Sequence, residues 1–403
     1  MEHFNRYDDF NEKLPSNGEW DRYTDRQSGN WFSFTFLCVV VVLIGFGLVC
    51  MYSASYNNAL KNDLPGHYYV LRQAVFVLLG IAVSVGIRFI PMEFIKKMTP
   101  VILVVSVVLM LLTWIPSLGV SRLGARRWLE IGPLPAFQPS ELLKISAIMM
   151  LARYFAEHGG KERLQIQEAL FPVALVMVCA VLILAQKDYS TAMVFLGMGF
   201  SLFLIAGFPL SWLVLLLAAL GVPAAIFLLL EPYRIHRLVS FLFPTIDPNG
   251  MNWQVSNSLK AIGSGGLWGK GLGKGVYKLG KIPEVQSDFI FANIGEEMGL
   301  FGMVLVLLFF LLFAVLGFRC YCRLHSRNRY QALLAFGITC MIVWQALVNI
   351  AVVTGLLPPT GIPLPFFSQG GTNLFVMICE CGLLYKIIAA CGPVPTEKTI
   401  HAQ

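Results

Sequence analysis

Charged side chains are scarce in this chain, and their scarcity decides the class of protein. Asp, Glu, Lys and Arg make up 13% of the 403 residues, against about 25% in ordinary soluble domains. Apolar and aromatic residues make up 57%, and the mean hydropathy is +0.69. A soluble globule could not cover so much apolar surface, whereas the lipid-facing exterior of a membrane protein is itself apolar. The composition therefore predicts an all-α polytopic membrane protein, with room for about ten spans.

The residue patterns of metal, cofactor and nucleophile chemistry are also lacking. The nine cysteines and six histidines show no zinc spacing, and no nucleophile elbow or cofactor fingerprint occurs. The run from Gly275 to Lys281 has P-loop spacing, but Ile282 stands where Ser or Thr is required. The net charge of +7 is scattered, which argues against nucleic acid and fits lipid headgroups or a phosphorylated lipid. A requirement for a divalent cation stays open.

No cleavable signal peptide is visible either. Residues 1–31 are polar and predict a disordered cytoplasmic tail, so the first span would act as an uncleaved anchor. Residues 32–391 predict one transmembrane domain with a large extracytoplasmic loop at 231–287, and 392–403 predict a cytoplasmic C-terminal tail. The predicted spans are 32–53, 69–88, 98–116, 141–157, 168–185, 190–206, 210–230, 288–317, 331–355 and 371–391.

Lys and Arg in the short loops predict the orientation. They favour the loops that face the cytoplasm when both termini are cytoplasmic. In that orientation the loops rich in Pro, Gly, Trp and Arg all face outward. These outer loops are 117–140, 186–189, 231–287 and 356–370. The asymmetry predicts that the chemistry takes place at the outer face.

Two groups of residues flank the fourth span. Arg126 and Arg127 offer planar forks that fit phosphate oxygens, and Trp128 suits stacking on a sugar. The alternative is a plain Arg and Trp anchor in the membrane interface. Glu141 and Lys144 are three residues apart, so they share a helix face at the mouth of a span. They form either an ordinary ion pair or part of a functional site.

Carboxylates mark the eighth span. Asp288 lies where loop becomes span, and there it either caps a helix or takes a proton from a hydroxyl. Glu296 and Glu297 lie inside the span and need partners such as Lys144, or water. The preceding run 263–280 holds eight glycines and predicts a flexible basic loop on lipid headgroups. Prolines in 355–371 predict either a segment that lines a cavity or a rigid external turn.

These motifs, taken in order, resemble the SEDS family (shape, elongation, division and sporulation), the group of FtsW, RodA and SpoVE. The resemblance covers roughly residues 32–391. The chain departs from the family pattern at Gln186–Thr191 and Ser368–Asn373. The matching runs are Gly124–Trp128, Gln138–Lys144, Tyr233–Arg237 with Asp247 and Pro248, Ile262–Gly273, Pro283–Ala292, Gly295–Gly299 and Thr354–Gly371.

The resemblance implies a ten-helix bundle that polymerises lipid II into β-1,4 glycan strands outside the cytoplasmic membrane. It implies that Asp288 is the catalytic base for the 4-hydroxyl of the acceptor sugar. Support of the cavity is implied for Glu141 and Glu296. Binding of the substrate or its diphosphate is implied for Arg126, Arg127, Trp128 and Lys144.

The same resemblance implies a class B penicillin-binding protein, a transpeptidase, as partner, together with divisome or elongasome proteins. The N-terminal tail and the run Ile294–Glu297 favour a division role at the septal inner membrane. The run Gly361–Phe367 is more typical of elongation. Two other interpretations stay open, namely a lipid II flippase, which would place its charges near the bilayer midplane, and a scaffold that recruits an enzyme.

Overall fold

The structure, a computed structural model, describes residues 17–122, 125–130, 132, 135–158, 166–208, 241 and 253–391. Within them the chain forms ten α-helices, a 3-10 helix (Tyr277–Leu279) and an antiparallel hairpin of β1 (Gly119–Arg122) and β2 (Ala125–Leu129). The helices are α2 (Asn17–Lys61), α3 (Tyr68–Phe89), α4 (Met92–Leu112), α5 (Pro139–His158), α6 (Ile166–Ala185), α7 (Tyr189–Ile205), α10 (Trp253–Gly265), α11 (Ile290–Leu324), α12 (Arg329–Val353) and α13 (Gly371–Ala390).

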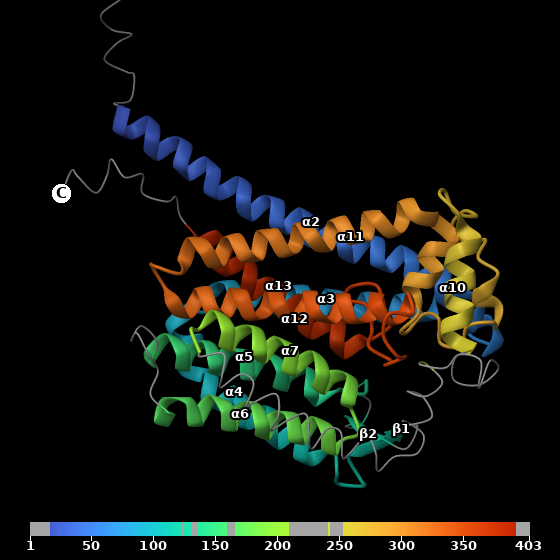
Figure 1. Cartoon of the computed structure of the whole chain (residues 1–403), viewed down its shortest axis with the longest axis horizontal. Helices are drawn as coiled ribbons and strands as arrows, with labels where there is room; N and C mark the ends of the chain where they lie inside the picture. The colour runs from blue at the N-terminus through green and yellow to red at the C-terminus, as the bar shows by residue number, and fades with distance from the viewer. Residues whose placement is uncertain are drawn as a thin grey trace, which may run out of the picture.

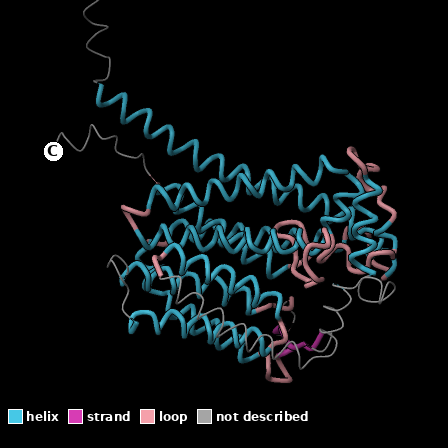
Figure 2. The backbone as a smooth tube through the Cα atoms, in the orientation of Figure 1, coloured by secondary structure: helices cyan, strands magenta, loops and turns pink. Residues whose placement is uncertain are grey.

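The helices form one bundle in which the long helices run side by side (Figures 1 and 2). Helix α10 and the hairpin lie at one end of the bundle. Helix α2 begins and α13 ends at the opposite end (Figure 1). The end that carries α10 and the hairpin is called the loop end below. The first and last described helices of the chain therefore begin and end, respectively, at the same end of the bundle.

Seven helices in the described part are long and apolar enough to span a membrane: α2, α3, α4, α6, α11, α12 and α13. In the most apolar stretch of α3 and α4 only 22% of residues are buried, against 67% in α12 and 56% in α13. Because apolar residues face outward on α3 and α4, these helices form a lipid-facing rim. Helices α12 and α13 lie at the centre.

The predicted spans within the described residues coincide with helices, and the helix ends differ. Helix α2 begins at Asn17, inside the stretch predicted to be a disordered tail, and α11 continues to Leu324 rather than 317. Hydropathy detects the apolar middle of a helix, whereas its polar ends carry no such signal. The loop predicted at 231–287 includes α10 and the 3-10 helix. The predicted span 210–230, residues 1–16 and the tail at 392–403 lie outside the described residues.

Helix α11 is interrupted close to the loop end. Gly299 has φ 66° and ψ −161°, and a Cβ there would lie 2.4 Å from the backbone nitrogen of Gly269. The N–H groups of Lys270 and Gly271 donate to carbonyls of α11 before the break, at 3.0 and 2.9 Å. Beyond the break, the N–H of Leu300 donates to the carbonyl of Gly266 at 2.9 Å. Residues 266–280, which make these contacts, are called the glycine-rich loop below. The loop thus satisfies backbone groups that the interrupted helix leaves open.

Candidate functional site

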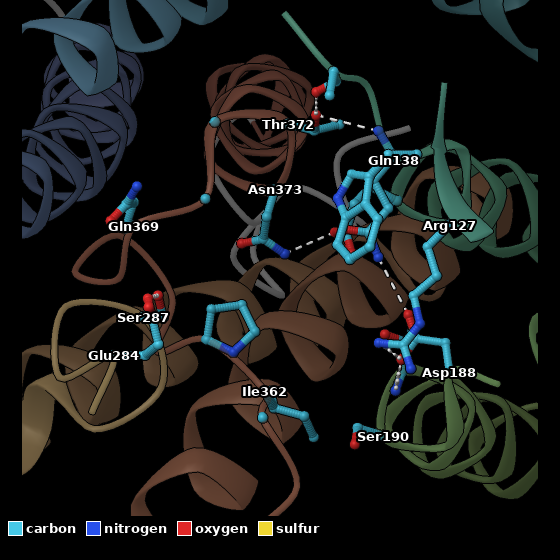
Figure 3. A pocket seen from close by; sticks show the side chains of 18 of the residues that line it. Arg127, Gln138, Asp188, Ser190, Glu284, Ser287, Ile362, Gln369, Thr372 and Asn373 are labelled. Atoms are coloured by element: carbon cyan, nitrogen blue, oxygen red, sulfur yellow. Dashed lines mark hydrogen bonds and ion pairs between the residues drawn. The ribbon is translucent and has the colours of Figure 1, made fainter. Parts of the chain in front are cut away.

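A polar pocket of about 410 Å³ opens at the loop end of the bundle (Figure 3). Side chains from α3, β2, α5, α7 and α13 line it, together with the segments before α11 and before α13. Of the residues singled out from the sequence, Arg127, Trp128 and Glu141 line this pocket. The fold therefore gathers, in one place, motifs that are far apart in the chain.

Arg127 is fixed on one wall by α7. Its guanidinium lies 3.6 Å from the carboxylate of Asp188 and donates to the carbonyl of Lys187 at 2.6 Å. Gln138 also donates to Asp188, at 3.2 Å (Figure 3). Asp188 in turn caps α7 by accepting from the backbone N–H of Thr191. This network holds the arginine at the N-terminus of α7. Sequence reasoning had assigned no role to the segment that precedes α7.

Arg126 does not line the pocket. Its side chain is exposed and donates to the carbonyl of Trp114 at 3.4 Å. Of the two arginines, β2 presents only Arg127 to the pocket, next to Trp128, and the pairing of β2 with β1 is irregular between Arg126 and Trp128. The prediction that both arginines bind the diphosphate treated them as equivalent, and the strand separates them. Arg72 of α3, which lines the pocket, supplies a cation that sequence reasoning missed.

Glu141 and Lys144 form a buried ion pair on α5, with Nζ and Oε2 2.9 Å apart. Asn373 donates to the same carboxylate oxygen at 2.7 Å, and Lys144 also donates to Oε1 of Gln345 at 3.4 Å. The amide of Gln345 donates to Oδ1 of Asn373 at 3.4 Å, which closes a ring of four side chains. We call Glu141, Lys144, Gln345 and Asn373 the four-residue ring.

The four-residue ring lies beneath the pocket. Glu141 and Asn373 line the pocket itself, and all four members line a second, very small cavity of about 10 Å³. That volume corresponds to about one water molecule. Lys144 is only 3% exposed, so it contacts the pocket through its partners. The shared helix face predicted for Glu141 and Lys144 is confirmed.

Asp288 is two residues before α11 and adjoins the pocket without being one of the residues that line it. It is half-buried and directly follows Ser287, which lines the pocket. Its Oδ2 lies 3.8 Å from where a Cβ on Gly361 would be, and Gly361 also lines the pocket. Asn349 donates to the backbone carbonyl of Asp288 at 2.8 Å. The carboxylate is therefore placed between the start of α11 and the proline-rich loop 355–370.

Glu296 does not support this pocket. Its buried carboxylate pairs with Lys270 at 2.7 Å and accepts from the backbone N–H groups of Val276 and Tyr277. Lys144, which was considered beside water as a partner for the glutamates of α11, is therefore not their partner. The cause is the interruption of α11, which brings the glycine-rich loop, rather than α5, onto these carboxylates.

Glu297 is held in the same way. It pairs with Lys278 of the glycine-rich loop, and Ser53 of α2 donates to both of its carboxylate oxygens, at 2.7 and 2.6 Å. The Lys278 side chain is 2% exposed. The prediction of a flexible basic loop on headgroups is wrong for Lys270 and Lys278, because both ammonium groups turn inward to neutralise buried carboxylates.

Within the described part of the chain, no group of three or more His, Cys, Asp or Glu side chains could hold a metal ion. The polar contacts instead come from amides and ion pairs. Four polar side chains, Gln73, Gln345, Asn349 and Glu380, are buried inside apolar helices, and both carboxylate oxygens of Glu380 lack a hydrogen-bond partner among the described residues. Sequence reasoning missed these residues, although a polar side chain within an apolar span is itself a signal of function.

A bundle of apolar helices with a polar pocket at one end defines a polytopic membrane protein with its site at the end of the bundle. The family model described as "Cell cycle protein" (FTSW_RODA_SPOVE) matches residues 34–391. The chain belongs to this family of FtsW, RodA and SpoVE proteins, as its motifs predicted.

Relatives and solved structures agree with this assignment. The chain is 35% identical over 353 residues to a probable peptidoglycan glycosyltransferase FtsW of Borreliella burgdorferi, covering 87% of this chain and 95% of the relative. It is 36% identical over 347 residues to an FtsW of Escherichia coli with the same description, covering 85% and 82%.

Two solved structures share the fold. A chain from the structure titled "Structural coordination of polymerization and crosslinking by a peptidoglycan synthase complex" matches with TM-score 0.72 and 27% identity, covering 89% of this chain and 98% of that one. The crystal structure of RodA from Thermus thermophilus matches with TM-score 0.65 and 25% identity, covering 88% and 96%. The predicted SEDS fold is confirmed.

Proposed function

We propose that this protein is a peptidoglycan glycosyltransferase that polymerises lipid II into β-1,4 glycan strands. The observation that carries the proposal is the pocket, which Arg127 and Glu141 line and which Asp288 adjoins through Ser287 and Gly361, with the Glu141–Lys144 pair beneath. Family membership and the names of relatives in Borreliella burgdorferi and Escherichia coli support the same activity.

The chemistry follows from these positions. Asp288 takes the proton of the acceptor sugar's 4-hydroxyl, and the oxygen attacks the donor sugar carbon that bears the undecaprenyl diphosphate. The bond from that carbon to the diphosphate breaks, and the diphosphate leaves with the bonding electrons. Arg127 stabilises the negative charge that develops on the leaving group, because its network with Asp188 fixes it before the reaction.

Lys144 contributes differently from the way the sequence implied. Its ammonium is closed off by Glu141 and Gln345, so it acts through the carboxylate of Glu141, which lines the pocket. Trp128 and Arg72 line the pocket and supply a ring for stacking on a sugar and a second cation for the diphosphate. Glu296 and Arg126 have no part in this mechanism.

The cellular setting is part of the proposal. The bias of Lys and Arg in short loops supports cytoplasmic termini and a pocket open to the outer face. Similarity to FtsW relatives supports a division role at the septum. The solved peptidoglycan synthase complex supports a class B penicillin-binding protein as partner.

The flippase alternative has less support. Its charges should surround a transport path near the bilayer midplane. The carboxylates of α11 nearest the middle are neutralised by Lys270 and Lys278 instead.

Polymerisation of lipid II by the purified protein, alone and with its transpeptidase partner, tests the function. Glycan chains support it. Absence of polymer in both cases, with translocation of lipid II across vesicles, would favour the flippase.

A further inference from the structure

Two amide side chains lie on one face of α12, four residues apart. Gln345 is 3% exposed and Asn349 1% exposed. Burying an amide inside an apolar helix is costly unless its polar atoms find hydrogen-bond partners. The hydrogen-bond partners of these two amides therefore indicate their role.

Asn349 ties two segments of the pocket wall together. Its Nδ2 donates to the backbone carbonyl of Asp288 at 2.8 Å and to that of Ile362 at 2.7 Å. An amide nitrogen has two hydrogens, so both donors are used. Its Oδ1 has no hydrogen-bond partner among the described residues. The contribution of Asn349 thus comes from its donors.

Gln345 makes the corresponding links one turn earlier. Its Nε2 donates to the carbonyl of Pro363 at 3.1 Å and to Asn373 at 3.4 Å, and its Oε1 accepts from Lys144 at 3.4 Å. One side chain therefore binds the proline-rich loop, α13 and α5. Ile362 and Pro363 are adjacent, so the two amides hold consecutive carbonyls of that loop.

The loop depends on such contacts. Its prolines prevent helix formation, and its backbone carbonyls must find partners elsewhere. It lies between Asp288 and Lys144, which belong to elements far apart in the chain and share α12 as a common support. We propose that Gln345 and Asn349 are positioning residues, which fix the separation between the Asp288 carboxylate and the Glu141–Lys144 pair. This inference rests on the proposed function.

The test is a comparison of kinetics in the purified complex of the full chain with its transpeptidase partner. Asn349→Ala removes both donors, and Asn349→Asp keeps the size while replacing the donors with acceptors. A misplacement of about 1 Å can cost about 100-fold in rate. We expect kcat for lipid II polymerisation to fall between about tenfold and 100-fold in both variants, with KM within about twofold.

Thr339→Val is the matched control. Thr339 is buried on the same helix and donates only to the carbonyl of Ala335, within α12. We expect this variant to keep the native kcat, and Asn349→Ala to unfold on heating at the same temperature as the control. If Asn349→Ala is not recovered folded, Gln345→Met repeats the test, since it removes the amide at similar length.

Full kcat in both Asn349 variants would overturn the inference, as would a loss of rate that only follows a loss of folded protein. Asp288→Ala separates this inference from the proposed function. If Asp288→Ala is inactive while Asn349→Ala has full kcat, positioning is wrong and the base assignment stands. If Asp288→Ala is fully active, the base assignment fails and this inference fails with it.

Discussion

Removal of the Lys144 ammonium should destabilise the protein strongly, because it leaves a buried charge without its partner. The side chains of Lys144 and Glu141 are 3% and 7% exposed, and their charged atoms lie 2.9 Å apart. Breaking a buried pair of this kind costs about 3–5 kcal/mol. Glu141 would keep its hydrogen bond from Asn373 at 2.7 Å. We therefore expect Lys144→Met to lower the free energy of unfolding by about 3 kcal/mol, the lower end of that range.

A double-mutant cycle tests this reasoning. Glu141→Gln in the Lys144→Met background removes the uncompensated charge, so the double variant should be more stable than Lys144→Met alone. The measurement is denaturant unfolding in detergent micelles, followed by the intrinsic tryptophan fluorescence. Native stability of Lys144→Met, or a double variant whose loss is the sum of the two single losses, would refute a coupled buried pair.

Three further predictions concern other parts of the site and its frame. Lys278→Met should destabilise by about 3–5 kcal/mol, and Lys270→Met by less, because the Lys278 side chain is 2% exposed and Lys270 32%; equal losses in thermal unfolding would contradict this. Gly299→Ala should reduce the yield of folded protein in detergent, because a Cβ there would meet the backbone of the glycine-rich loop at 2.4 Å; native yield would argue against the interruption of α11. Arg127→Lys should lower the polymerisation rate about tenfold or more, since the ammonium of Lys cannot make the two parallel hydrogen bonds of a guanidinium. Arg126→Lys should keep the native rate. Equal rates in the two variants would show that the two arginines do not differ in their access to the substrate.

Hydropathy was sufficient to predict the bundle. An apolar run of about 20 residues has few alternatives to a membrane helix, and the helices from α3 to α7 and from α11 to α13 follow the predicted spans. The face shared by Glu141 and Lys144 also followed from helical spacing alone. Local periodicity fixed these features, so no knowledge of tertiary contacts was needed.

Partners across the bundle could not be predicted in this way. Glu296 binds Lys270 rather than Lys144 because α11 breaks at Gly299 and admits the glycine-rich loop. Nothing in the spacing of these residues specifies that break. Arg126 was assigned to the pocket together with its neighbour, although only Arg127 of the two lines it. Which of the two arginines lines the pocket depends on the irregular pairing of β2 with β1.

Polar residues inside the apolar spans carried a signal that was not used. Gln345 and Asn349 are the only amide side chains in α12 apart from Gln331 in its first turn. Their cost in a membrane helix indicates a structural or functional contact. The sequence could therefore have marked them as candidates, while the identity of their partners depends on how α5, α12 and the proline-rich loop pack.

The most direct test of the account compares lipid II polymerisation by the native chain with that by Asp288→Asn, each in complex with the transpeptidase partner. Glu157→Gln is the control, because it neutralises a carboxylate that pairs with Lys96 at the far end of α5. We predict glycan chains from the native protein and from the control, and none from Asp288→Asn at equal folded protein. Polymer from Asp288→Asn at the native rate would contradict the assignment of Asp288 as the base.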